Sequence, residues 1–117
     1  METTNAVSGL AALAHPGRLQ VFRLLVRAGH DGLAAGEIAR ATGSLPNTLS
    51  ANLNILAGAG LVSARRDGRS MIYTAGYDRM SELLAFLMED CCAGKPEICA
   101  PLAALASQAC AAEGRSC

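Results

Sequence analysis

The sequence is poor in aromatic residues, in net charge and in long apolar runs. With two Tyr, two Phe and no Trp in 117 residues, aliphatic side chains must form the core, which favours closely packed helices in one domain. Ten basic and ten acidic side chains balance, which argues against a general polyanion binder but leaves room for a local basic patch. Nothing approaches the ~20 apolar residues of a membrane span, and no charged leader precedes an apolar run. We therefore expect a cytoplasmic protein without a membrane partner.

Hydrophobic periodicity predicts a helical first half. Apolar residues recur at helical spacing in four segments separated by Gly and Pro residues. The predicted helices lie within residues 3–14, 16–29, 36–43 and 46–60.

After residue 60 the spacing of apolar residues changes from that of helices to that of strands. Residues 61–65 and 70–75 predict two short strands, and Asp67-Gly68 between them is typical of a tight hairpin turn. Asp78 is expected to cap a further helix over 78–92, and an Ala-rich helix is expected over 101–112. This order of elements predicts an α+β fold, mainly α: a winged helix-turn-helix with dimerisation helices at both ends.

The terminal helices of this unit predict a homodimer. The helices expected over 3–14 and 78–92 carry apolar stripes that so short a chain cannot fully cover by itself. A dimer also reads two DNA half-sites about one two-fold axis. We therefore expect residues 1–92 to form the DNA-binding and dimerisation domain, and residues 93–117 to form a cysteine-containing tail.

The second helix of a helix-turn-helix places its N-terminal half in the major groove of double-stranded DNA. An inward Leu stripe leaves a polar outward set, namely Asn47, Thr48, Ser50, Ala51 and Asn54, with Asn52 at its edge. Asn can pair with adenine, and Ser or Thr can contact bases or phosphates. Because this helix has no Lys or Arg, phosphate anchoring is expected from Arg65, Arg66 and Arg69 at the hairpin tip.

The cysteines predict a metalloid site. Cys91 and Cys92 are adjacent, and Cys99 follows seven residues later in MEDCCAGKPEIC. Neighbouring Cα atoms lie ~3.8 Å apart, whereas disulfides usually need ~4.4–6.8 Å, so the adjacent pair suits sharing a third atom. Three thiolates with no histidine nearby suit a three-coordinate thiophilic ion, As(III) or Sb(III). The tail would complete this site by folding back at its Gly and Pro residues.

Other uses of these thiols stay open. A fourth thiolate from Cys110 would suit Zn(II), Cd(II) or Pb(II), and oxidation would bridge Cys91 or Cys92 to Cys99. A thiol-dependent enzyme would need an anion-cradling loop and a paired base, and AGKPEIC offers neither. We therefore expect no enzyme.

Four segments resemble the ArsR/SmtB family of dimeric winged-helix repressors, which release DNA on binding a metal. They are ALAHPGRLQVFRLL, GEIARATG, TLSANLNILAGAGLV and RRDGRSMIY, in order from about residue 11 to 77. The tail LLAFLMEDCC followed by EIC resembles the arsenic-responsive branch, whose sensor cysteines follow the last dimerisation helix. Residues 34–38 lack the Cys-x-Cys pair of other arsenic sensors, and the last dimerisation helix lacks the His ligands of zinc sensors, so neither of those sites is expected.

Overall fold

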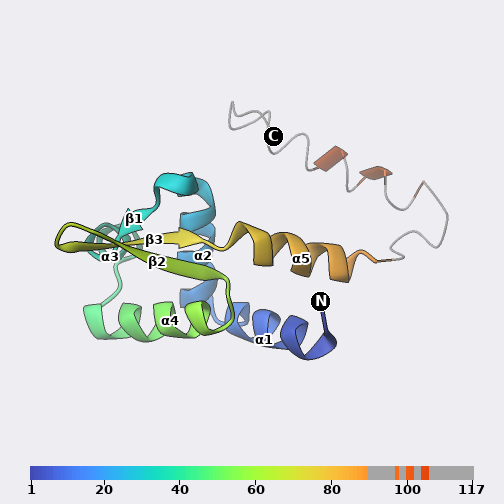
Figure 1. Cartoon of the computed structure of the whole chain (residues 1–117), viewed down its shortest axis with the longest axis horizontal. Coiled ribbons are helices and arrows are strands. Elements are labelled where there is room, and N and C mark those ends of the chain that lie inside the picture. The colour runs from blue at the N-terminus through green and yellow to red at the C-terminus, as the bar shows by residue number, and fades with distance from the viewer. Residues whose placement is uncertain (90–96, 98–99, 102–103, 106–117) are drawn as a thin grey trace. The chain divides into compact units, whose positions relative to one another are not determined.

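The computed structural model describes residues 1–89, 97, 100–101 and 104–105 of the chain. Residues 1–86 form one compact unit. Its helices are α1 (Thr3–Leu13), α2 (Pro16–Ala28), the short 3-10 helix η1 (Gly29–Asp31), α3 (Ala35–Thr42), α4 (Pro46–Gly58) and α5 (Tyr77–Leu87) (Figure 1). Its strands are β1 (Leu33–Ala34), β2 (Val62–Asp67) and β3 (Ser70–Ala75). The predicted winged helix-turn-helix, α+β and mainly α, is confirmed.

The wing is an antiparallel sheet of three strands in the described part of the chain, in the order β1-β3-β2. Strands β2 and β3 pair along their whole length, from Val62↔Ala75 to Asp67↔Ser70. Strand β1 adds two residues against β3 and ties the segment before α3 to the wing. The sequence did not predict β1, because two residues are too few to show a period.

The hairpin turn lies one residue later than Asp67-Gly68. Asp67 is the last residue of β2 and pairs with Ser70, so Gly68 and Arg69 form the turn. Gly68 has φ +62°, a conformation that glycine adopts without the Cβ clash of other residues. The shift matters because it brings Arg69 to the very tip of the wing.

The core lies where α2, α3 and α4 meet the sheet, and it is almost wholly aliphatic, as the composition predicts. Its buried members are Ala12, Val21, Phe22, Leu25, Ile38, Leu49, Leu53, Leu56, Leu61, Val62 and Ala75. Among the helices that the structure describes, none is long and apolar enough to cross a membrane.

The corner between α1 and α2 is held by polar contacts that sequence reasoning missed. The Nδ1 atom of His15 accepts hydrogen bonds from the backbone N–H groups of Gly17 and Arg18, at 3.1 and 3.4 Å, and so caps α2. Arg18 Nε donates to the carbonyl oxygen of Ala12 at 2.6 Å, and its Nη2 donates to that of Ala11 at 3.5 Å. A cation at the end of α1 also complements the helix dipole.

Helix α5 begins at Tyr77, one residue before the start that the sequence predicts. Asp78 therefore lies inside the first turn and is not the cap, although its carboxylate still favours the positive end of the helix dipole. The described helix ends at Leu87. Residues 90–92 of the predicted helix lie outside the described residues.

Described residues of the C-terminal tail are helical. They are residues 97, 100–101 and 104–105, and the rest of the helix predicted over 101–112 lies outside the described residues.

Helices α1 and α5 pack against each other through a glycine. Gly9 of α1 is buried, and a Cβ atom added there would lie 3.5 Å from Cδ2 of Leu83 in α5. Both helices also carry exposed apolar side chains, Val7 and Leu10 on α1, and Leu84 and Leu87 on α5. The two predicted stripes are therefore partly covered within the chain and partly open.

The Gly9 contact leads to a stability prediction. A Cβ at 3.5 Å makes ordinary van der Waals contact, and Ala is a better helix former than Gly, so Gly9→Ala should raise the free energy of unfolding by about 0.5–1 kcal/mol. Thermal unfolding followed by circular dichroism at fixed protein concentration would measure this as a rise of a few degrees in Tm.

Gly76→Ala is the matched control. A Cβ atom at Gly76 would overlap the carbonyl oxygen of Gly60, which is backbone and cannot rotate away. This substitution should lower the free energy of unfolding by about 1–3 kcal/mol. A loss of stability in Gly9→Ala would contradict the α1–α5 packing described above.

Candidate nucleic-acid interface

The turn between α3 and α4 is fixed by short-range hydrogen bonds. Gly43 adopts the left-handed conformation, and its N–H donates to the carbonyl oxygen of Ala39 at 2.8 Å, which ends α3. The Thr42 hydroxyl donates to the carbonyl oxygen of Ile38 at 2.8 Å and lies 2.7 Å from the Ser44 hydroxyl. These contacts set the direction in which α4 leaves α3.

Helix α4 divides into an apolar and a polar face, as the sequence predicts. Leu49, Leu53 and Leu56 are buried in the core. The opposite face exposes Asn47, Thr48, Ser50, Ala51 and Asn54. Side chains on this face are free to reach base edges, and their contact with DNA stays a prediction.

Asn52 departs from the expected face. Only 6% of its surface is exposed. A Cβ atom added at Gly17 of α2 would lie 3.1 Å from Asn52 Nδ2, so the amide packs against the α1–α2 corner. Asn52 is therefore not at the edge of the outward set. The prediction assumed that polar residues of α4 face outward, and Asn52 is a polar residue that faces inward.

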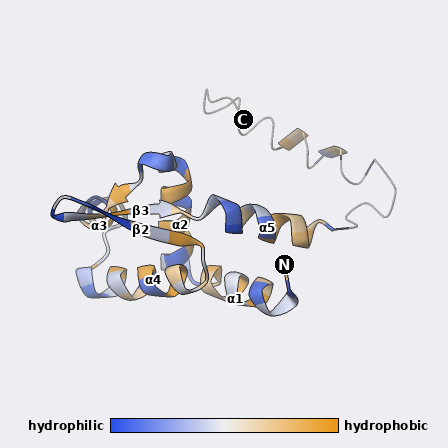
Figure 2. Cartoon of the chain, in the orientation of Figure 1, coloured by the Kyte–Doolittle hydropathy of each residue, from blue (hydrophilic) through white to orange (hydrophobic). Residues whose placement is uncertain are grey.

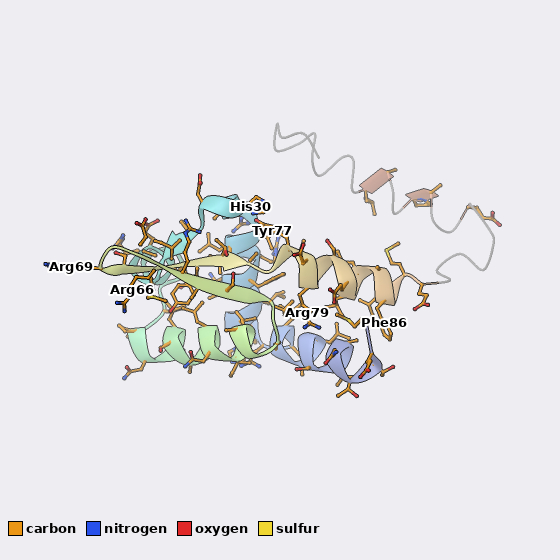
Figure 3. All side chains as sticks on the ribbon, in the orientation of Figure 1. His30, Arg66, Arg69, Tyr77, Arg79 and Phe86 are labelled. Atoms are coloured by element: carbon orange, nitrogen blue, oxygen red, sulfur yellow. The ribbon has the colours of Figure 1, made fainter. Side chains whose placement is uncertain are left out.

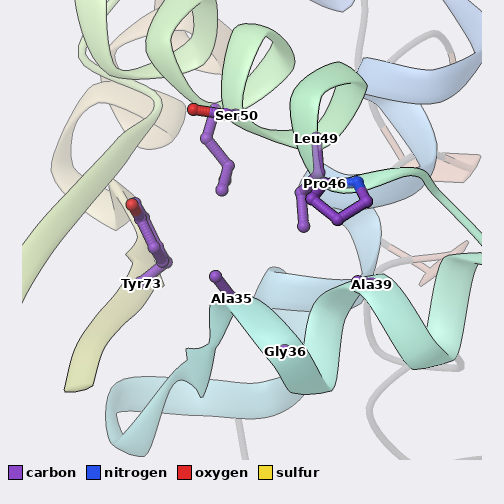
Figure 4. A pocket seen from close by; sticks show the side chains of 8 residues that line it. Ala35, Gly36, Ala39, Pro46, Leu49, Ser50 and Tyr73 are labelled. Atoms are coloured by element: carbon purple, nitrogen blue, oxygen red, sulfur yellow. The ribbon is translucent and has the colours of Figure 1, made fainter.

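A small, mostly apolar pocket of about 180 Å³ lies between α3, α4 and the sheet (Figure 4). It is lined by Ala35, Gly36, Ala39, Pro46, Leu49, Ser50, Leu53 and Tyr73. None of these side chains is a Cys, His, Asp or Glu.

The three wing arginines do not share one environment. Arg66 and Arg69 lie at the exposed, hydrophilic tip of the hairpin (Figures 2 and 3). Arg65 lies one pair further back, opposite Ile72. Its guanidinium donates to the carbonyl oxygens of His30 and Asp31, at 3.3 and 2.9 Å. The expected cluster at the tip therefore consists of two arginines, and the third is bound to η1.

The positive charges of the candidate interface lie on the wing, because α4 contains no charged side chain. The one ion pair among the described residues joins Arg79 and Glu82 on α5 at 3.9 Å. Arg66 and Arg69 thus make no ion pair with any residue that the structure describes, so their charge is available to phosphates.

The predicted metalloid ligands cannot be placed. Cys91, Cys92 and Cys99, and also Cys110, lie outside the described residues. Within the described part of the chain, no group of three or more His, Cys, Asp or Glu side chains is arranged to hold a metal ion.

This geometry predicts that the wing contacts phosphates and that α4 contacts bases. Arg66→Ala or Arg69→Ala should weaken binding to every DNA sequence and lower the slope of log K against log salt by about 1. Asn47→Ala or Ser50→Ala should instead relax sequence preference and leave that slope unchanged. Fluorescence anisotropy over a salt series, with specific and random duplexes, would measure both quantities.

Two controls match these substitutions. Arg23→Ala removes an exposed arginine from α2 and should change neither quantity. Asn52→Ala should lower the free energy of unfolding by about 1 kcal/mol without altering base preference, since its side chain is buried. An unchanged affinity and salt slope after neutralising both Arg66 and Arg69 would show that the wing assignment is wrong.

Comparison with known proteins agrees with this architecture. A family model described as a helix-turn-helix domain matches residues 13–64. The uncharacterised HTH-type transcriptional regulator Rv0081 of Mycobacterium tuberculosis is 40% identical over 73 residues. That match covers 62% of this chain and only 62% of the relative's length.

Two solved structures extend the comparison to the fold. The homodimeric winged helix-turn-helix domain of Mb0332 from Mycobacterium bovis, a possible ArsR-family regulator, is 36% identical with TM-score 0.61, over 73% of this chain and 76% of that chain. A protein described as a possible transcriptional regulator for arsenical resistance is 28% identical with TM-score 0.60, over 68% of this chain and 80% of that chain.

The buried stripe of α4, the basic wing and these relatives lead to one assignment. The chain belongs to the ArsR family of winged helix-turn-helix transcriptional regulators.

Proposed function

We propose that this regulator is a homodimeric repressor that holds operator DNA and releases it when As(III) or Sb(III) binds Cys91, Cys92 and Cys99. The observation that carries the proposal is the position of the vicinal pair, four and five residues beyond the described end of α5. Three soft thiolates in one short segment suit a thiophilic, three-coordinate ion. The reducing cytoplasm, where we expect the protein to act, would keep these thiols free.

The dimer is supported by apolar surface on the terminal helices. Val7 and Leu10 on α1, and Leu84 and Leu87 on α5, are each at least two-fifths exposed. Apolar side chains gathered on two packed helices favour burial against a partner with the same surface. The related domain of Mb0332 is described as homodimeric, which supports the same assembly here.

A charge on this face tests the dimer. Leu84→Glu should convert the dimer into a monomer at micromolar concentration, because burying an unpaired carboxylate opposes association. Sedimentation velocity would measure the change. Leu45→Glu is the matched control, since Leu45 is also exposed, at 72%, but lies at the start of α4. A wild-type monomer at micromolar concentration would contradict the proposed assembly.

Ligation beside α5 offers a direct route to DNA release. Binding at Cys91 and Cys92 would restrain the end of a helix that we assign to the dimer interface. A change there alters the spacing of the two α4 helices, and half-site spacing tolerates little error. An effector shifts DNA binding only by its differential affinity for the two states, and typical coupling corresponds to about 5–150-fold weaker binding.

One of the solved relatives supports the choice of effector. The structure described as a possible transcriptional regulator for arsenical resistance shares 28% identity with this chain, which connects the fold with that physiological role in a related protein.

Single substitutions of the cysteines test the ligand set. Cys91→Ser, Cys92→Ser and Cys99→Ser should each keep apo DNA binding but abolish arsenite-induced release, because each removes one of three thiolates. Cys110→Ser and Cys117→Ser should retain the response and serve as controls. Anisotropy of a labelled operator, with thiol counting on the same sample, would measure release and ligation together.

Other outcomes would select among the alternatives. Normal arsenite release from Cys99→Ser would contradict the three-thiolate site and favour a two-cysteine or Cys110-containing one. Release by Cd(II) or Pb(II) that requires Cys110 would favour the four-thiolate site. Release by peroxide without added metalloid would favour thiol oxidation.

A further inference from the structure

The first residue of α5 anchors that helix to α2. The Tyr77 hydroxyl donates to the carbonyl oxygen of Val26 at 2.8 Å and lies 3.4 Å from that of Leu25. Both carbonyls belong to the C-terminal end of α2, where carbonyl groups lack partners within the helix. The hydroxyl is partly buried, so few waters compete for these acceptors. One side chain thus ties the start of α5 to the end of α2.

The ring of Tyr77 also touches the loop that leads to the wing. The imidazole of His30 in η1 meets the Tyr77 ring edge to face, with ring centroids 5.0 Å apart and an interplanar angle of 62° (Figure 3). This is a favoured geometry for aromatic pairs, and it makes η1 sensitive to where α5 begins.

From η1 the contacts continue into the wing. The carbonyl oxygens of His30 and Asp31 accept hydrogen bonds from Arg65 on β2. Immediately after η1, Gly32 lies so close to β3 that an added Cβ atom would overlap the carbonyl oxygen of Tyr73. The short segment 29–32 therefore contacts both the first residue of α5 and strands β2 and β3 of the wing.

We propose that Tyr77, His30, Asp31 and Arg65 form a relay through which displacement of α5 moves the DNA-contacting wing, with Tyr77 as its positioning residue. The four residues come from three elements far apart in sequence and make one contiguous set of contacts. Arg66 and Arg69 lie on the hairpin that Arg65 holds, so a shift of Arg65 changes where both charges stand. The effector part of this inference rests on the proposed arsenic response.

Hydrogen exchange tests the mechanical link without DNA or metalloid. In the full-length apo protein, Tyr77→Phe and Arg65→Ala should each speed exchange of the amides in residues 62–75 at least about threefold, because each removes a hydrogen bond that opposes local opening. Amides of α4 should keep wild-type rates, which would separate a loosened wing from general destabilisation.

Two variants are matched controls for this measurement. Tyr73→Phe removes the hydroxyl of the chain's other tyrosine, which hydrogen-bonds to no residue that the structure describes. Arg66→Ala removes the arginine next to Arg65, whose guanidinium makes no such contact with η1. Both should leave wing exchange at the wild-type rate after correction for intrinsic rates.

DNA release tests the functional consequence. Tyr77→Phe should bind operator within about threefold of wild type, but the factor by which arsenite weakens binding should fall at least about threefold. The double variant Tyr77→Phe/Arg65→Ala should lose no more of this factor than the stronger single variant, since both act on one relay. Tyr73→Phe should keep the wild-type factor.

Each outcome has a definite meaning. Wing exchange that is unchanged in Tyr77→Phe would overturn the relay, as would an undiminished arsenite response in that variant. If wild type shows no arsenite release but wing exchange responds as expected, the relay stands and the proposed effector is wrong.

Discussion

Burial of Leu49, Leu53 and Leu56 is the interaction on which the rest of the structure depends. These three side chains hold α4 against α2, α3 and the sheet. Because they occupy one stripe of the helix, the opposite stripe must face solvent. The polar surface offered to DNA is thus a by-product of core packing, and the short hydrogen bonds of the α3–α4 turn only refine its direction. Loss of this packing would remove the core and the DNA-facing surface together.

The predicted base contacts and the predicted phosphate contacts lie on different elements. Helix α4 bears polar side chains without a formal charge, whereas the wing tip bears Arg66 and Arg69. The architecture is set by core packing, so a chain with no net charge and no basic residue on α4 can still adopt the winged helix-turn-helix fold. Two arginines per protomer, doubled in the proposed dimer, supply a local field without making the chain a general polyanion binder.

Elements with a repeating pattern were predictable from the sequence, and single contacts were not. Apolar spacing predicted the main helices and the hairpin, since periodicity reports which side of an element is buried. Periodicity gave the wrong face for Asn52, a polar residue that faces inward, and it missed β1, whose two residues are too few to show a period. The roles of Arg65, Arg18 and Tyr77 depend on carbonyl groups 34, 6 and 51 residues away along the chain, and composition holds no signal for such partners. The cysteine ligands stay a prediction from spacing alone.

The acceptors bound by Tyr77 and Arg65 are main-chain carbonyl oxygens. Every amino acid supplies such an oxygen, so positions 25, 26 and 31 can change their side chains without removing an acceptor. Tyr77 and Arg65 cannot be replaced in the same way, because only a long side chain with a polar end reaches these carbonyl oxygens. The hydrogen bond from α5 to α2 and the one from the wing to η1 therefore depend on the side chains of their donors, Tyr77 and Arg65, and not on those of their acceptors. The side-chain requirements of the segment 29–32 come instead from the His30 ring, which packs on Tyr77, and from Gly32, which lies against Tyr73.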